Sequence, residues 1–71
     1  MTDRELLEKV IRESGVKISR LLSATGIRSY ATFRSRLANE SEFKAGEIDA
    51  ISRLLGLSVE QRDRIFFARN V

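Results

Sequence analysis

The stretch from Lys17 to Leu37, KISRLLSATGIRSYATFRSRL, constrains this fold more than any other part of the sequence. Apolar residues recur there at helical spacing, with Ile18, Leu21 and Leu22 before a glycine and Phe33 and Leu37 after it. Gly26 suits the left-handed backbone conformation that ends a helix, and Ser29 is a good N-cap for the next helix. The stretch therefore predicts two short helices, 17–25 and 30–38, joined by a tight turn.

The second of these helices has an outer face of small and polar side chains. Phe33 and Leu37 lie on the same side of the helix because they are four residues apart. At 100° per residue, the opposite face carries Ala31, Ser35 and, less centrally, Thr32, with Tyr30 and Arg34 on one flank and Arg36 on the other. Two short helices arranged in this way, a helix-turn-helix, place the second helix in the major groove of DNA.

Charge is distributed unevenly along the chain, although the net charge of +3 is modest. Residues 14–39 contain no acidic side chain and five basic ones, Lys17, Arg20, Arg28, Arg34 and Arg36. The other residues carry eight basic and ten acidic side chains. This asymmetry concentrates positive potential where a polyanion would bind. A solvated basic face without a partner is the alternative interpretation.

The remaining sequence predicts three further helices that pack against this pair. They are expected at about 3–13, 45–55 and 58–68, and each has an apolar stripe. Thr2 with Glu5, and Ser58 with Gln61, have the spacing of capping boxes, in which two side chains satisfy free backbone amides. Both pairs mark the expected starts of helices.

Three aromatic positions and one glycine need individual explanations. Phe43, in the 40–44 loop, is expected to insert into the core. Gly46 lies in the first turn of a helix, where it costs roughly 1 kcal/mol relative to alanine; close packing is the preferred explanation, and a phosphate at the helix N-terminus is the alternative. Ile65, Phe66 and Phe67 cannot all face one core from one helix. Either the helix end unravels, or one aromatic residue packs against another subunit.

Length and composition predict one all-α domain over residues 1–71 and exclude several classes of protein. A chain of 71 residues is near the lower limit of what folds alone. Histidine and cysteine are absent, which removes the usual catalytic bases, thiol nucleophiles, disulfides and metal sites. No stretch approaches the roughly 18 apolar residues of a membrane-spanning helix. We therefore expect a cytoplasmic protein that is not an enzyme, with no metal, cofactor, small-molecule substrate or membrane partner.

The order of these features resembles the phage Cro and CI repressor type of DNA-binding domain, also called the XRE type. The segment GIRSYATFRSRLANESEFKAGEIDAISRLLGLSVEQRDRIFF is especially similar to short Cro-like prophage regulators of Gram-positive bacteria. Those chains share an aromatic residue and a leucine in the recognition helix, EF before the fourth helix, EI within it, and a closing IFF. The resemblance covers Leu6 to Phe67.

The resemblance implies a five-helix, lambda-repressor-like fold with the helix-turn-helix as its second and third helices. It implies base reading by Tyr30, Ala31 and Ser35, with Thr32 and Arg34 as secondary candidates. It implies phosphate contacts for Lys17, Arg28, Asn39 and Lys44, to which the charge pattern adds Arg36. One residue more than in the commonest family pattern lies between Gly26 and Phe33, so a longer turn is expected.

Two functions are compatible with this sequence. The leading interpretation is a sequence-specific transcriptional regulator of lysogeny, a Cro-type repressor that binds a two-fold bacteriophage operator in double-stranded DNA as a homodimer. The alternative is a protein-interaction module, either an antirepressor that binds the phage repressor protein or an antitoxin. In that case the partner contact is expected from Ile65, Phe66 and Phe67.

Overall fold

The computed structural model describes residues 1–69, which form five α-helices and no strand. The helices are α1 (Arg4–Ser14), α2 (Ile18–Thr25), α3 (Tyr30–Leu37), α4 (Ala45–Leu55) and α5 (Val59–Phe66). The all-α class predicted from the sequence is confirmed, and each helix begins and ends within two residues of its expected position. Residues 70 and 71 of the predicted domain lie outside the described residues.

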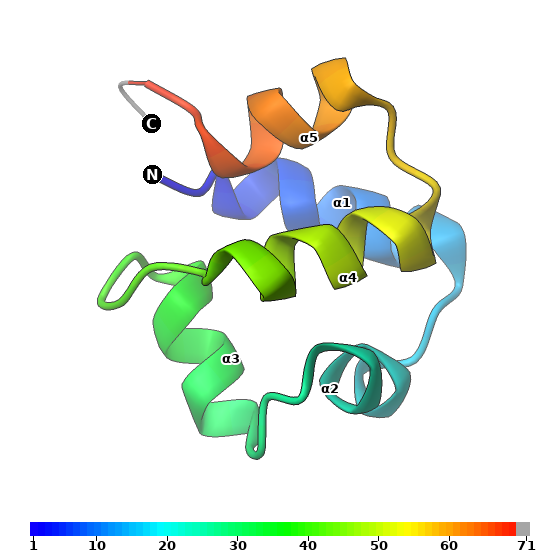
Figure 1. Ribbon diagram of the computed structural model, residues 1–71, viewed down its shortest axis with the longest axis vertical. Coiled ribbons are helices and arrows are strands. Elements are labelled where there is room, and N and C mark those ends of the chain that lie inside the picture. Colours follow the sequence, from blue (N-terminus) through cyan, green and yellow to red (C-terminus); the bar gives the residue numbers. More distant parts are fainter. Residues whose placement is uncertain (70–71) are drawn as a thin grey trace.

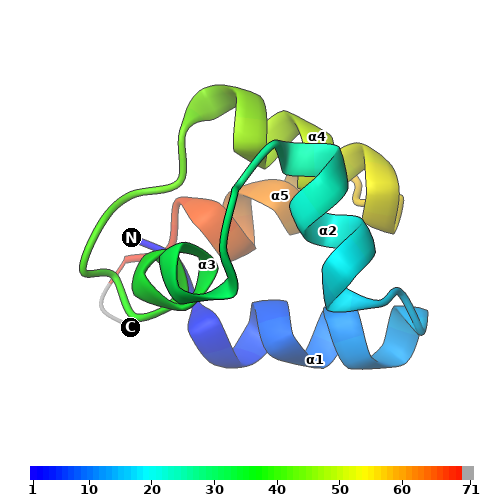
Figure 2. The same cartoon turned by 90° about the horizontal axis from the view of Figure 1, so that it is seen from below.

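Helix α4 lies at the centre of the arrangement, with α2 and α3 on one side and α5 on the other (Figure 1). Helix α1 lies behind α4 in this view and contacts both α4 and α5. Helix α2 packs chiefly against α4. Seen from below, α2 and α3 face the viewer together (Figure 2), so this pair forms one side of the molecule.

The core combines apolar residues from all five helices and from the segments on either side of α3. Its buried members are Leu7, Ile11, Leu21, Ile27, Phe33, Leu37, Phe43, Ile51, Ile65 and Phe66. Phe43 packs edge-on against both Phe33 and Phe66, with ring centroids 5.9 Å and 5.4 Å apart. The predicted insertion of Phe43 is confirmed. Aromatic pairs of this geometry add about 0.5–1.5 kcal/mol each to the effect of burial, so the loop after α3 is anchored by its one aromatic residue.

The start of α1 differs from the prediction. Asp3 is the N-cap, because its Oδ1 accepts a hydrogen bond from the Leu6 amide at 3.1 Å. Thr2 is buried, and its backbone amide and carbonyl both bond to the side chain of Asn39, at 2.7 Å and 2.9 Å. The prediction that Thr2 caps the helix is therefore wrong, since contacts with a distant residue hold it.

The starts of α4 and α5 follow from local side-chain chemistry. Ser58 and Gln61 form the predicted capping box. The Glu47 carboxylate accepts a hydrogen bond from the Lys44 amide at 2.9 Å and so satisfies a free donor at the start of α4. A Cβ atom placed on Gly46 would meet no atom within 4 Å. Close packing, the preferred explanation for Gly46, is therefore wrong.

Helix α5 ends at Phe66 and not at the expected Ala68. The segment before α1 lies beside this end: the Asp3 amide donates to the Ile65 carbonyl at 2.7 Å, and the Ala68 amide donates to the Met1 carbonyl at 3.0 Å. The sequence left two explanations for the apolar run at 65–67: either the helix end unravels, or an aromatic residue packs against another subunit. The structure agrees with the first, because α5 ends before Phe67, the third residue of the run.

Candidate nucleic-acid interface

Helix α3 is positioned by the residues that precede it and by two buried side chains. Gly26 ends α2 in the left-handed conformation, with a φ angle of 77°, which a residue without a Cβ adopts readily. The Ser29 hydroxyl accepts a hydrogen bond from the Thr32 amide at 3.2 Å, as expected of an N-cap. Phe33 and Leu37 are 1% and 4% exposed. They orient the opposite face of α3 toward the surface.

The outer face of α3 is open to solvent. Ala31 is exposed and Ser35 is half-buried, so neither is packed in the core. A shallow concavity runs over this face, and we call it the α3 valley; it is lined by Arg4, Ala31, Arg34, Ser35, Ala38 and Glu40. Three of its lining side chains are small, and its charged residues come from α1, from α3 and from the segment after α3.

The three remaining base-reading candidates, Tyr30, Arg34 and Thr32, differ in their surroundings. Tyr30 is 52% exposed, and the guanidinium carbon of Arg34 lies 5.9 Å from the centroid of its ring, within cation–π range. Thr32 is half-buried, and its hydroxyl oxygen lies 3.0 Å from that of Ser29. Thr32 therefore belongs to the capped start of α3 more than to its outer face.

The α2–α3 side of the molecule carries exposed cations that take part in no ion pair within residues 1–69. These are Lys17, Arg20, Arg28 and Arg34. Lys17 is the N-cap residue of α2, and Arg28 lies in the connection between α2 and α3. Cations without a carboxylate partner keep their full charge for a polyanion.

Arg36 has a different environment from the one that a phosphate contact requires. Its Nε lies 2.9 Å from Oε1 of Glu47, and the two side chains are only 12% and 11% exposed. Its Nη1 donates to the Ser41 hydroxyl at 3.1 Å and to the Glu42 carbonyl at 3.3 Å. Arg36 is thus committed to joining the end of α3 to the start of α4, and we remove it from the phosphate-binding set.

Asn39 is also committed within the chain. Its φ angle of 61° is left-handed, a conformation that asparagine tolerates better than most residues. Its side chain makes the two hydrogen bonds to the backbone of Thr2 described above. We therefore remove Asn39 from the phosphate-binding set as well. Lys44, by contrast, is exposed at the start of α4 and remains a candidate for a phosphate contact.

Tertiary structure brings acidic residues to a surface whose own sequence window has none. Glu40 lines the α3 valley. Glu8 of α1 lines a neighbouring groove together with Tyr30, and it pairs with Arg4 at 2.9 Å. Arg4 was not among the sequence-derived candidates, because no local pattern indicates that the start of α1 lies beside α3.

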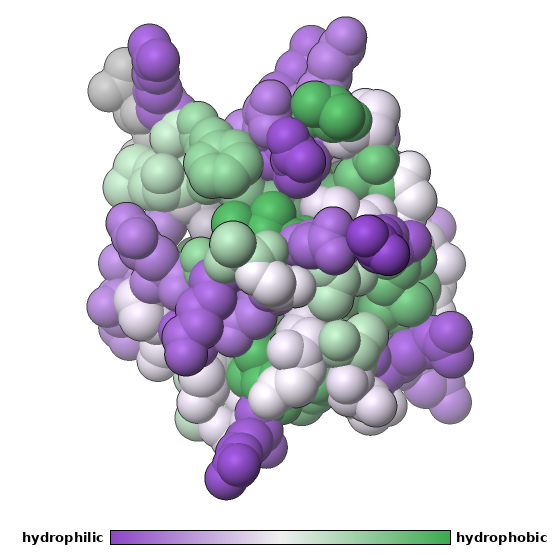
Figure 3. Space-filling model, in the orientation of Figure 1, coloured by the Kyte–Doolittle hydropathy of each residue, from purple (hydrophilic) through white to green (hydrophobic). Residues whose placement is uncertain are grey.

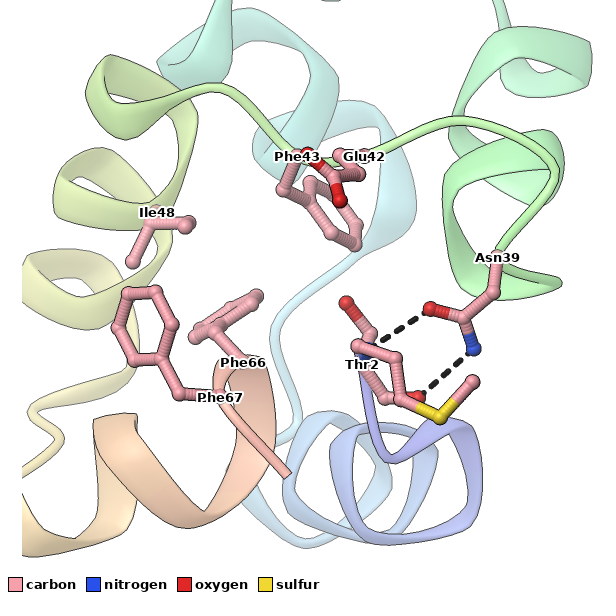
Figure 4. A pocket seen from close by; sticks show the side chains of 8 residues that line it. Thr2, Asn39, Glu42, Phe43, Ile48, Phe66 and Phe67 are labelled. Carbon is pink, nitrogen blue, oxygen red and sulfur yellow. Dashed lines mark hydrogen bonds between the residues drawn. The ribbon is translucent and has the colours of Figure 1, made fainter. Parts of the chain in front are cut away.

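The expected partner-contact residues are mostly internal. Ile65 and Phe66 are 0% and 4% exposed and belong to the core of this chain, so the prediction that they contact a partner is wrong. Phe67 is 57% exposed. It lies beside Ile48 of α4 at the rim of a pocket (Figure 4). Figure 3 shows apolar surface gathered where the segment after α5 meets α4.

Residues 1–69 contain neither a candidate metal site nor a helix that could span a membrane. No group of three or more His, Cys, Asp or Glu side chains is placed to hold a metal ion in this part of the chain. None of the described helices combines the length and the apolar character needed to cross a membrane. No family model, curated protein or solved structure matches the sequence or the structure.

Proposed function

We propose that this chain is a helix-turn-helix protein that binds double-stranded DNA through α3 and regulates transcription. The observation that supports this most is the open outer face of α3, where Ala31 and Ser35 lie close to the exposed cation Arg34. The major groove of B-DNA admits an α-helix. Small side chains on the leading face allow the helix backbone to approach the base edges.

The residues divide into two groups under this proposal. Ala31 and Ser35 contact base edges, with Tyr30 and Arg34 on one flank and Thr32 near the cap. Lys17, Arg28 and Lys44 contact phosphates, which fix the position and orientation of the protein on the duplex. Arg20 joins this second group because it is exposed on α2.

The order of the five helices supports the resemblance to Cro-type regulators, with α2 and α3 as the helix-turn-helix. Four residues, 26–29, connect the two helices, which is within the usual 3–4 residues of such a turn. We propose that the protein acts in the cytoplasm on a two-fold phage operator. A homodimer there would place its two copies of α3 about 34 Å apart, one turn of DNA.

Fluorescence anisotropy with two labelled duplexes tests the proposal. One duplex carries a sequence selected from a random library by the protein, and the other carries the same bases scrambled. We expect Ser35→Ala to weaken binding to the selected duplex alone, by about 1–3 kcal/mol if its base contact is a good one. We expect Lys17→Gln to weaken binding to both duplexes and to reduce the salt slope by about 1. Failure of the unmodified protein to bind any duplex at low salt would refute DNA binding.

A second candidate function is binding to another protein, and the exposure of Phe67 beside Ile48 supports it. The partner would be a phage repressor, as for an antirepressor, or a toxin, as for an antitoxin. A pull-down against a purified phage repressor, with and without Phe67→Ser, tests this candidate. Capture that persists unchanged in the variant would rule out the Phe67 surface.

A further inference from the structure

The α3 valley contains both hydrogen-bond donors and an acceptor. The guanidinium groups of Arg4 and Arg34 can only donate, and the Glu40 carboxylate can only accept. A surface that served phosphate alone would have no use for a carboxylate, because the two negative charges repel. A base-pair edge in the major groove, by contrast, presents acceptors and donors side by side.

Glu40 is held at a defined place at the end of α3. The left-handed conformation of Asn39 turns the chain, and the Glu40 amide then donates to the Ser35 carbonyl at 2.9 Å. An acidic side chain beside a helix C-terminus is unfavourable, since that end of the helix carries partial negative charge. Glu40 also forms no ion pair with any described residue. Fold stability therefore does not account for a carboxylate at this position.

The two arginines are held by different contacts. Arg34 lies over the Tyr30 ring, at 5.9 Å. Arg4 bonds Glu8 through its Nε at 2.9 Å, and its terminal nitrogens have no hydrogen-bond partner among the described residues. Arginine favours the two acceptors of guanine, N7 and O6, because its planar group can donate two parallel hydrogen bonds.

We propose that the α3 valley selects G·C base pairs: Arg34 donates to N7 and O6 of a guanine, and Glu40 accepts from the N4 amino group of a cytosine. This inference rests on the proposed DNA-binding function and names the base composition of the sequence that is bound. Arg4 lines the same valley and adds a positive charge to it. Ala31 and Ala38 leave room for the base edges.

The test begins with selection of binding sites from a random DNA library by the full chain. We expect guanine and cytosine at fixed positions in the selected half-site. Replacing that guanine with 7-deazaguanine, which lacks N7, should weaken binding several-fold for the unmodified protein and have no effect for Arg34→Ala. Arg34→Lys keeps the positive charge but cannot donate two parallel hydrogen bonds from a planar group. It should retain affinity for scrambled DNA and lose about 5- to 150-fold on the selected site, the range that follows from 1–3 kcal/mol.

Glu40→Gln gives the sharpest test because its effects have opposite signs. The Gln carbonyl oxygen is a neutral acceptor, and a hydrogen bond to a charged acceptor is about twice as strong as one to a neutral acceptor, so the cytosine contact should weaken and binding to the selected duplex should fall about 2- to 10-fold. Loss of the negative charge should strengthen binding to scrambled DNA. Glu42→Gln is the matched control: it makes the same change in charge two residues away at an exposed residue that does not line the α3 valley, and it should affect both duplexes alike.

The outcomes separate this inference from the function on which it depends. Equal strengthening of both duplexes by Glu40→Gln, or selected sites made of A·T pairs alone, would overturn the inference and leave DNA binding intact. No binding of the unmodified protein to any duplex would overturn both. The thermal midpoint of Glu40→Gln should equal or slightly exceed that of the unmodified protein, so a loss of specificity in this variant cannot be ascribed to unfolding.

Discussion

At the scale of single residues, the pair of Arg36 with Glu47 is the most buried ion pair within residues 1–69. It is nearly buried and connects α3 to α4, whereas the pair of Arg53 with Asp49 lies at the surface with side chains 81% and 63% exposed. A buried charge that loses its partner remains desolvated, while a surface charge is hydrated and screened. The two pairs should therefore respond very differently to the loss of one carboxylate.

We expect Glu47→Gln to lower the free energy of unfolding by about 3 kcal/mol, because Arg36 would remain buried without its counter-charge. Asp49→Asn is the control and should change it by less than about 1 kcal/mol. Urea denaturation followed by circular dichroism measures both. Similar losses in the two variants would mean that Arg36 is hydrated in solution.

The neighbouring residues Phe66 and Phe67 provide a second contrast. Phe66→Ser should destabilise the protein by about 3 kcal/mol or more, because it empties space in the core. Phe67→Ser should stay within about 0.5 kcal/mol of the unmodified protein, since the side chain is largely exposed. Thermal unfolding distinguishes them. A large loss for Phe67→Ser would show that this ring is buried in solution, against its exposed position.

At the scale of helices, most boundaries could be predicted because they depend on nearby residues. Gly26, Ser29 and Ser58 act within one turn of their own position, and the spacing of Phe33 and Leu37 is sufficient to orient α3. The start of α1 could not be predicted in the same way. Thr2 has the right chemistry to cap the helix, but its backbone is hydrogen-bonded to the side chain of Asn39. A contact between residues so far apart in the sequence leaves no local pattern from which it could be predicted.

Two glycines in or beside α4 should respond oppositely to alanine. Gly46→Ala should raise the free energy of unfolding by about 0.5–1 kcal/mol, because the position is helical and has open space around the new Cβ. Gly56→Ala should lower it by more than that, since Gly56 has a φ angle of +64°. Chemical denaturation measures both. If Gly46→Ala proved destabilising, the surroundings of Gly46 would have to be closer packed than described.

At the scale of the whole molecule, the basic window of residues 14–39 forms α2 and α3, which lie together on one side of the protein (Figure 2). In the folded protein, Glu40 and Arg4 lie next to the outer face of α3, whereas Arg36 is nearly buried in an ion pair with Glu47. The net charge of the chain therefore says little about how it would meet a polyanion. The distribution of charge over the α2–α3 side is the relevant quantity.

The proposed two-fold binding mode makes a prediction about spacing. If two copies bind one operator, inserting about five base pairs between the half-sites should abolish cooperative binding, because the second half-site moves to the opposite face of the helix. Inserting a full turn of about ten base pairs should restore part of it. Gel-shift titrations with such duplexes measure the cooperativity. Equal binding at every spacing would indicate that the chain acts as a monomer.

Local patterns in the sequence were sufficient for the all-α class, the approximate helix bounds and the position of Ala31 and Ser35 outside the core, because helix periodicity and capping act over three or four residues. They were not sufficient to assign Arg36, Asn39 and Phe66, whose side chains are taken up by contacts with Glu47, Thr2 and the core. Nor could they place Arg4 beside α3. Which charged side chains stay free for a ligand depends on how distant segments pack, and that is settled only when the whole chain has folded.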